Sequence, residues 1–422
     1  MSKLAIHGGS PVRTKPFPRW PVFSETDARA VARVVLSGVW GRTTGKVVAQ
    51  FEQAFAKLQG ARHGVAMVNG TTGLRLALMA AGISEGDEVI VPPYTFLATA
   101  TAVVEANAVP VFVDIDAETC NINPALIEAA ITPRTRAIIP VHFGGLACDM
   151  DRIMAIAAKY KLKVIEDACH GWGGKWKQKG LGCIGDLGVF SFQASKNLTA
   201  GEGGFIATND ECLFEIAQSL HNCGRLRPKA AAGGSGTGVP ASAWYLHHLL
   251  GGNHRMTEMQ GALLLSQLKR LRRQTQRRDA NGRYLNRELA RVPGIKPMRR
   301  DPFASVVSYH LYLFRYDPAA FAGKPRDKFI AAMKAEGVNL SPGYPVPLYK
   351  QPVFLNKNFG PYTGWKHTRP NLDYGKVSCP ACEKACASEV VWLPHPTLLG
   401  GRRDMDDIVE AAAKVQQHAV EI

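Results

Sequence analysis

The sequence lacks a long apolar segment, a cysteine framework and enough acidic residues to balance its basic ones. Residues 89–104 are uncharged but contain prolines and several threonines, so they fall short of the ~20 apolar residues that a membrane-spanning helix needs. The first nine residues lack the apolar core of a signal peptide. We therefore expect a cytoplasmic protein that has no contact with a membrane.

Cysteine is too scattered to build a disulfide framework. The nine cysteines are an odd number, as expected for reduced thiols in a cytoplasm. Cys379, Cys382 and Cys386 have a spacing that resembles a metal site, but a fourth ligand and a second CxxC motif are missing. The sequence therefore predicts no metal centre.

Acidic residues are outnumbered, with 35 Asp and Glu against 51 Lys and Arg and a net charge of +16. Much of the excess lies in residues 225–300, above all in the segment 269–278. This segment has no interleaved aromatic residues and matches no nucleic-acid-binding module. We expect the solvated face of a long helix; a site for an anionic substrate or a partner surface is the alternative.

Strand and helix patterns alternate between residues 64 and 210. The predicted strands are 65–68, 89–91, 109–113, 137–141, 163–166, 187–191 and 203–207, and the predicted helices are 74–81, 98–106 and 151–161. This alternation predicts an α/β fold, a three-layer sandwich with a mainly parallel sheet covered on both faces. In such sheets the ligand lies beyond the carboxyl ends of the strands.

The length of 422 residues is sufficient for more than one domain. We expect an N-terminal arm over residues 1–22, a large domain over 23–290 and a smaller C-terminal α/β domain over 291–422. A long helix at 257–289 is expected to lead into the smaller domain. A flexible glycine-rich loop is expected at 228–242.

Lys196 is the most informative residue for predicting the function. It follows the predicted strand 187–191 and precedes a glycine-rich segment that permits a close backbone approach, while Asp167 follows the strand 163–166. Pyridoxal 5'-phosphate (PLP) requires a lysine for a Schiff base and a carboxylate to pair with its pyridinium nitrogen. We therefore predict Lys196 and Asp167 as catalytic residues. A surface lysine and a helix N-cap are the structural alternatives.

Other residues at strand ends complete the predicted site. Gly70, Thr71 and Thr72 open a helix directly after a strand, where free N–H groups and the helix dipole favour a phosphate. Ser191, five residues before the lysine, is expected to hold the same phosphate. The further candidates are Phe96 to stack on the cofactor ring, His170 to reach its phenolic oxygen, and His142 on the substrate side.

Taken together, these segments resemble the sugar aminotransferases of the DegT/DnrJ/EryC1/StrS family. The resemblance extends from about residue 20 to 415, and its most specific pieces are 91–96, 140–142, 166–170, 191–193 with Lys196, 201–204 and 253–258. It implies fold type I of the PLP enzymes. The lysine favours amino transfer, because dehydratases related to this family replace it with histidine.

The resemblance also implies roles at the matching positions. Lys196 would carry the cofactor and move the substrate proton, and Asp167 would pair with the pyridine nitrogen. Family members are homodimers with active sites at the interface, so Asn253 or Arg255 is expected to reach the partner's cofactor. The expected cofactor shell is Gly70, Thr71, Thr72, Phe96, His170, Ser191, Gln193, Asn253 and Arg255.

Gln193, the pair 348–349 and the pair 379–380 are more similar to members that act on keto-inositols, or to 3-amino-5-hydroxybenzoate synthases, than to nucleotide-sugar members. We therefore expect a keto-sugar or scyllo-inosose-like keto-cyclitol as acceptor and L-glutamate or L-glutamine as donor. The expected substrate residues are Tyr94, His142, Arg225 and Tyr344. The alternatives are an enzyme that couples amination with dehydration, and a non-catalytic binding protein on the same scaffold.

Overall fold

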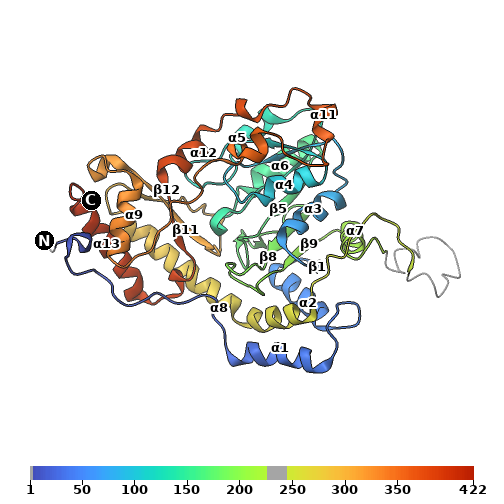
Figure 1. The fold of residues 1–422 in the computed structure, drawn as a ribbon, viewed down its shortest axis with the longest axis horizontal. Coiled ribbons are helices and arrows are strands. Elements are labelled where there is room, and N and C mark those ends of the chain that lie inside the picture. The colour runs from blue at the N-terminus through green and yellow to red at the C-terminus, as the bar shows by residue number, and fades with distance from the viewer. Residues whose placement is uncertain (1–2, 226–244) are drawn as a thin grey trace.

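A seven-stranded sheet forms the centre of the larger part of the molecule (Figure 1). The computed structural model describes residues 3–225 and 245–422, so the predicted loop at 228–242 lies outside the described residues. In spatial order the strands are β1 (His63–Met67), β9 (Gly204–Thr208), β8 (Leu187–Ser191), β5 (Lys163–Asp167), β4 (Thr135–Ile138), β2 (Glu88–Val91) and β3 (Val109–Phe112). The strands from β8 to β3 run parallel, and β9 runs antiparallel to both of its neighbours. The mainly parallel sheet and its seven predicted strands are confirmed.

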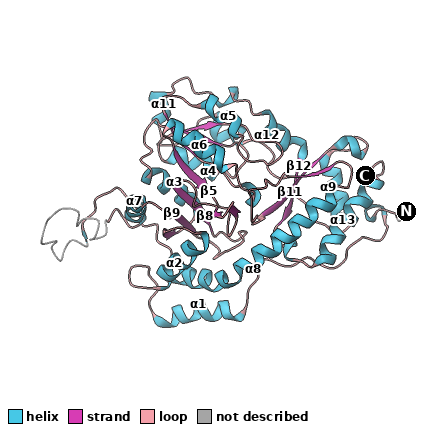
Figure 2. Ribbon diagram, turned by 180° about the vertical axis from the view of Figure 1, so that it is seen from behind, coloured by secondary structure: helices cyan, strands magenta, loops and turns pink. Residues whose placement is uncertain are grey.

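Helices cover both faces of this sheet (Figure 2). On one face Phe190 of β8 and Phe205 of β9 pack with Phe55 of α2 in a single core cluster. The alternate residues Val189 and Ile206 belong to a second core cluster, on the face that α3 covers. Because successive side chains of a strand point to opposite faces, one strand contributes to both cores. The predicted three-layer arrangement is confirmed.

The α-helices are distributed along the whole of the described chain. They are α1 (Glu25–Ser37), α2 (Val47–Gln59), α3 (Gly70–Ala80), α4 (Ala98–Glu105), α5 (Pro124–Ile127), α6 (Met150–Tyr160), α7 (Glu211–His221), α8 (Glu258–Leu289), α9 (Arg326–Ala335), α10 (Pro352–Leu355), α11 (Gly364–Thr368), α12 (Pro380–Lys384) and α13 (Arg402–Gln417). A capping box of Thr257 and Gln260 starts α8, the long helix predicted at 257–289.

The C-terminal part of the chain forms a smaller antiparallel sheet of β10 (Ile295–Pro297), β11 (Leu311–Tyr316) and β12 (Val390–Pro394). A two-stranded hairpin of β6 (Lys175–Trp176) and β7 (Lys179–Gly180) lies apart from both sheets. Helix α8 runs from the large sheet towards the smaller one, where α13 contacts it (Figure 1). The domain boundaries at residues 22/23 and 290/291 stay a prediction.

The described ranges, 3–225 and 245–422, contain neither a membrane-spanning helix nor a cluster of metal ligands. No helix there is both long and apolar enough to cross a membrane. No group of three or more His, Cys, Asp or Glu residues in the same ranges is arranged to hold a metal ion. Cys379, Cys382 and Cys386 are buried free thiols.

Candidate active site

A cavity of about 710 Å³ opens beyond the carboxyl ends of β5 and β8. This is the edge of the sheet at which a doubly wound fold binds its ligand. The cavity wall contains nine of the residues predicted from the sequence: Gly70, Thr71, Phe96, Asp167, His170, Ser191, Gln193, Lys196 and Tyr344. The structure therefore brings together residues that are spread over more than half of the chain.

Asp167 ends β5 and is buried, with 6% of its surface exposed. Its Oδ2 accepts a hydrogen bond from the Thr99 hydroxyl at 2.8 Å, and its Oδ1 accepts one from the Cys169 N–H at 3.2 Å. The hydroxyl of Thr95 lies 2.9 Å from that of Thr99 and extends this network. Among the ion pairs of the described residues, none involves Asp167. A buried carboxylate with neutral donors alone can still bind a cationic group.

Lys196 lies half-buried in the cavity wall, in the loop after β8. Its backbone N–H donates to the carbonyl of Gln193 at 2.9 Å, and its side-chain Nζ lies 6.0 Å from the ring centre of Trp172. Burial lowers the pKa of the ammonium group, although Cys169 and Asp167 act in the opposite direction. A lowered pKa increases the unprotonated fraction, which is the nucleophilic form.

The N-terminus of α3 lies against the end of β8. The side chain of Asn69 caps the helix by accepting from the Thr72 N–H at 2.8 Å. An added Cβ on Gly70 would lie 3.0 Å from the Cβ of Ser191, and one on Gly204 would lie 2.3 Å from the backbone of Asn69. These close approaches make a cradle of small residues at a helix N-terminus, where an anion is favoured.

Three histidine rings stand in a row along the cavity wall. His170 and His310 have ring centres 4.2 Å apart, and those of His310 and His395 are 5.4 Å apart. Burial and the positive charge of Lys196 hold the pKa values of His170 and His310 well below the usual histidine value. The Nδ1 of His170 accepts from the Gly144 N–H at 3.2 Å, so the neutral ring carries its proton on Nε2.

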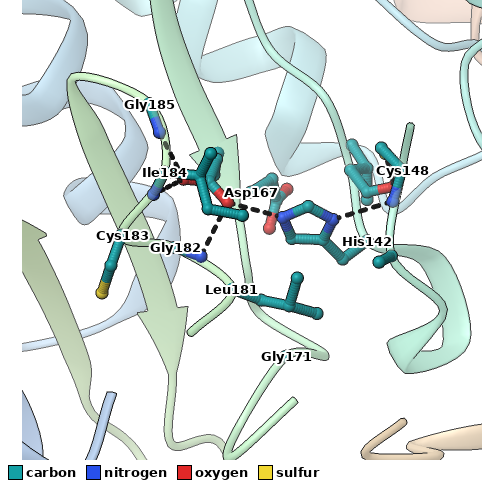
Figure 3. A network of polar contacts seen from close by, with 12 residues as sticks. His142, Cys148, Asp167, Gly171, Leu181, Gly182, Cys183, Ile184 and Gly185 are labelled. Atoms are coloured by element: carbon teal, nitrogen blue, oxygen red, sulfur yellow. Dashed lines mark hydrogen bonds and ion pairs between the residues drawn. The ribbon is translucent and has the colours of Figure 1, made fainter. Parts of the chain in front are cut away.

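His142 does not reach the cavity, contrary to the sequence-based expectation. The side chain is fully buried, and its Nε2 lies 2.8 Å from Oε2 of Glu166 (Figure 3). Its Nδ1 accepts from the Cys148 N–H at 3.2 Å, so the ring is neutral and donates to Glu166 through Nε2. Glu166 also accepts from the N–H groups of Gly182, Ile184 and Gly185. His142 therefore completes a structural network behind the site.

Two more predicted residues lie outside the cavity wall. Tyr94 is buried in an aromatic cluster with Phe143, Tyr344 and Trp392, and its hydroxyl accepts from Nε1 of Trp392 at 3.1 Å. Thr72 is not in the cavity wall, although its neighbours Gly70 and Thr71 are. The cavity is thus bounded by Tyr344 and Trp392, with Tyr94 supporting both from behind.

Asn253, Arg255 and Arg225 also lie outside the cavity wall. Arg255 donates to Oδ1 of Asn222 at 2.6 Å, and Asn253 forms a β-bridge with the same residue. The expectation that Asn253 or Arg255 reaches a partner's cofactor stays a prediction.

The structure adds wall residues that the sequence alone did not indicate. Trp20 of the arm, Thr99 of α4, and His310, Trp392 and His395 of the C-terminal part all line the cavity. Only Trp20 carried a visible sequence feature, as part of a segment rich in proline and arginine. The others become neighbours of Lys196 through tertiary contacts between distant segments.

Comparisons with known proteins agree with this geometry. A model of the DegT/DnrJ/EryC1/StrS aminotransferase family matches residues 22–412. A Streptoalloteichus tenebrarius protein, provisionally named an L-glutamine:3-amino-2,3-dideoxy-scyllo-inosose aminotransferase, is 40% identical, covering 99% of this chain and 98% of its own. The crystal structure of 3-amino-5-hydroxybenzoic acid synthase has a TM-score of 0.83 at 32% identity, covering 96% of this chain and 100% of its own. The structure of NtdA from Bacillus subtilis with bound cofactor PMP has a TM-score of 0.75 at 27% identity, covering 93% of this chain and 82% of its own.

Proposed function

Because the chain belongs to the DegT/DnrJ/EryC1/StrS aminotransferase family, we propose that it uses PLP to move an amino group from L-glutamine or L-glutamate to a keto-cyclitol. The observation that carries this proposal is the convergence of Lys196, Asp167 and the α3 N-terminus on one cavity. A lysine, a carboxylate and an anion cradle are the three protein groups that PLP needs.

The residues of the cavity fit this cofactor. Asp167 is a buried carboxylate without an ion-pair partner in the described chain, so a protonated pyridine nitrogen would supply the missing positive charge. The cradle of Gly70, Thr71 and Ser191 would hold a phosphate by N–H and hydroxyl donors. Phe96 and His170 line the same cavity and are the proposed contacts of the ring face and the ring oxygen.

The chain's own residues have separable tasks. PLP, when bound, supplies the aldehyde that carries the amino group and the ring that accepts electrons. Lys196 would hold the aldehyde carbon, and its free Nζ would take the proton from the substrate carbon. Asp167 would hold a proton at the ring nitrogen, and Thr99 orients the carboxylate by its hydrogen bond. The neutral His170 would donate from Nε2, since Nδ1 is already an acceptor.

The charges that this chain contributes to the cavity wall support an uncharged acceptor. Asp167, Lys196 and Glu202 are the charged residues in the described wall, and Lys196 is the one cation. A nucleotide-linked sugar carries a diphosphate, which proteins bind with additional cationic groups. Hydroxyl groups of a keto-cyclitol would instead meet the neutral imidazoles and the aromatic wall. The name of the 40%-identical relative supports the same substrate class, with L-glutamine as donor.

Amination coupled with dehydration is the second candidate. The structural similarity to 3-amino-5-hydroxybenzoic acid synthase favours it, although that similarity stands at 32% identity. Both reactions need Lys196 and Asp167. Formation of an aromatic product from the acceptor would identify the second reaction.

We also propose that the chain acts as a homodimer. Large apolar side chains are exposed at Leu36, Phe96 and Leu250, with 86%, 61% and 93% of their surface accessible. Phe96 lies in the cavity wall, so a partner that covers it would close the cavity on that side. Light scattering would test this: a monomer at micromolar concentration would refute it.

The absorbance spectrum is the first test of the proposed function. The purified protein with PLP is expected to absorb near ~420 nm, as a lysine-bound Schiff base does, and to bleach towards ~330 nm with L-glutamine or L-glutamate. Cyclitol ketones and nucleotide-linked ketosugars are then compared as acceptors. A protein that stays colourless with added PLP would refute the assignment, and amination of nucleotide sugars alone would refute the substrate class.

A further inference from the structure

Two consecutive backbone carbonyls precede Lys196, and each accepts a hydrogen bond from a distant ring. Nε1 of Trp20 donates to the carbonyl of Ala194 at 3.0 Å. Nε2 of His395 lies 2.9 Å from the carbonyl of Ser195, which can only accept. The first ring comes from the N-terminal arm and the second from the segment after β12. Two segments at opposite ends of the chain therefore hold the loop that carries Lys196.

Arg278 connects these two rings. The Nη2 of Arg278 lies 3.1 Å from Nδ1 of His395, and its guanidinium lies 5.5 Å from the ring centre of Trp20. The rings of Trp20 and His395 themselves meet edge to face at 4.5 Å. The three side chains thus form one contiguous cluster beneath the Lys196 loop.

Arg278 fixes the form of His395 that can hold the loop. A guanidinium can only donate, so Nδ1 of His395 must accept, and its proton must lie on Nε2. That is the nitrogen that faces the carbonyl of Ser195. Burial and the charge of Arg278 hold the pKa of His395 well below the usual histidine value, which keeps the ring neutral.

Packing alone does not account for Arg278. The residue is fully buried on α8, and no carboxylate of the described chain forms an ion pair with it. The neighbouring Asp279 pairs with Arg300 and Arg283 instead. Nε and Nη1 of Arg278 have no hydrogen-bond partner among the described residues, and burial lowers the pKa of the guanidinium to about 9. Such a cation is costly to bury, so an apolar residue would pack here at lower cost.

We propose that Trp20, His395 and Arg278 form a positioning clamp that sets where Lys196 stands in the cavity. The two rings hold the carbonyls of Ala194 and Ser195, and Arg278 orients His395 for this purpose. The clamp rests on the proposed role of Lys196 as the reacting lysine. It also gives the N-terminal arm predicted at residues 1–22 a task in the active site.

The test separates the hydrogen bonds from the packing of the rings. Trp20→Phe keeps a ring and removes the N–H donor; Trp176→Phe is its matched control, because Trp176 also donates one Nε1 hydrogen bond, to Asp151 at 3.1 Å, but lies outside the cavity wall. His395→Phe removes the second donor. His395→Gln places an amide N–H near the position of Nε2 and is the conservative rescue.

The first readout needs no cofactor. In apoprotein, the rate at which Lys196 is acetylated is followed against pH by peptide mass spectrometry. Loss of the clamp lets the Lys196 side chain leave its partly buried position and reach water, so Trp20→Phe and His395→Phe are expected to raise the apparent pKa of Lys196 towards the ordinary lysine value of 10.5. In Trp176→Phe and His395→Gln the profile should stay close to that of the wild type.

The second readout is kinetic. A lysine displaced by about 1 Å costs about 100-fold in kcat, with little change in KM, because binding of the ketone does not depend on the position of Lys196. Unchanged acetylation profiles in Trp20→Phe and His395→Phe would overturn the clamp, as would a His395→Gln variant as impaired as His395→Phe. If His395→Phe does not fold, Trp20→Phe decides alone. A wild-type protein that binds no PLP would refute the proposed function but leave the acetylation test of the clamp intact.

Discussion

The charge of Asp167 should matter far more to the loaded enzyme than to the fold. Replacing Asp167 by Asn keeps the shape of the side chain, and its network can adapt. The amide oxygen can accept from the Cys169 N–H, while the Thr99 hydroxyl can turn to accept from the amide and donate to Thr95. The perturbation is therefore the loss of one negative charge in a buried position.

The size of the effect follows from Coulomb's law. A carboxylate and a pyridinium nitrogen separated by about 4 Å, in surroundings with an effective dielectric constant of about 20, attract by about 4 kcal/mol. This corresponds to a loss of about 1,000-fold in kcat/KM. In apoprotein Asp167 forms no ion pair with a described residue, and Lys196 interacts with it only beyond ion-pair distance, so the melting temperature should change little.

Two assays check both halves of this prediction. Steady-state kinetics with L-glutamine and the identified ketone give kcat/KM, and calorimetry of the apoprotein gives the melting temperature. Asp151→Asn is the control, because Asp151 is ion-paired with Lys177 at the surface. A loss below about tenfold in kcat/KM would refute the role of the charge, as would a large drop in the apoprotein's melting temperature.

Three further outcomes are expected. Lys196→Ala should abolish turnover and the absorbance near ~420 nm, and normal turnover would exclude Lys196 as the reacting lysine. Glu166→Gln should lower the free energy of unfolding, measured by urea titration, by about 2–3 kcal/mol, because the new amide N–H₂ would face backbone N–H donors. The control Glu118→Gln, at an exposed position, should change this free energy by less than about 0.5 kcal/mol. Equal losses in the two variants would contradict a stabilising role of the Glu166 hydrogen bonds. Because burial lowers the pKa of Lys196, the folded apoprotein binds fewer protons than the unfolded chain. The stability of the apoprotein should therefore rise with pH from that lowered pKa up to 10.5. If a Lys196→Met variant shows the same rise, the rise is caused by another titrating group.

Features encoded within a short segment could be predicted from the sequence. The seven strands of the sheet and the start of α8 were identified from local patterns of apolar residues and caps. Lys196, Asp167 and the α3 N-terminus were found because each follows a strand, and strand ends meet at one edge of a parallel sheet. Trp20 and His395 could not be found in this way, because they approach Lys196 only through packing of distant segments.

One physical cause explains why His142 lies outside the cavity. Val141 of the chain pairs with Asp167 in a parallel β-bridge, so these two positions face the same way. Val141 and Asp167 line the cavity, and their neighbours His142 and Glu166 turn away from it and meet each other. Proximity to a strand end is thus insufficient to predict that a side chain lines the cavity, since the two-residue period of the strand decides which side chains face it.

Glu166 and Asp167 are adjacent acids, and the number of donors around each one separates their roles. Glu166 accepts from three backbone N–H groups and an imidazole, so it has no capacity left for a ligand. Asp167 accepts two hydrogen bonds, forms no ion pair with a described residue, and interacts with Lys196 beyond ion-pair distance. Arg278 is the corresponding cation, buried with two nitrogens that have no partner among the described residues. Buried charges that the fold does not neutralise reduce stability, and here one lines the proposed cofactor site and the other contacts His395, which holds the Lys196 loop.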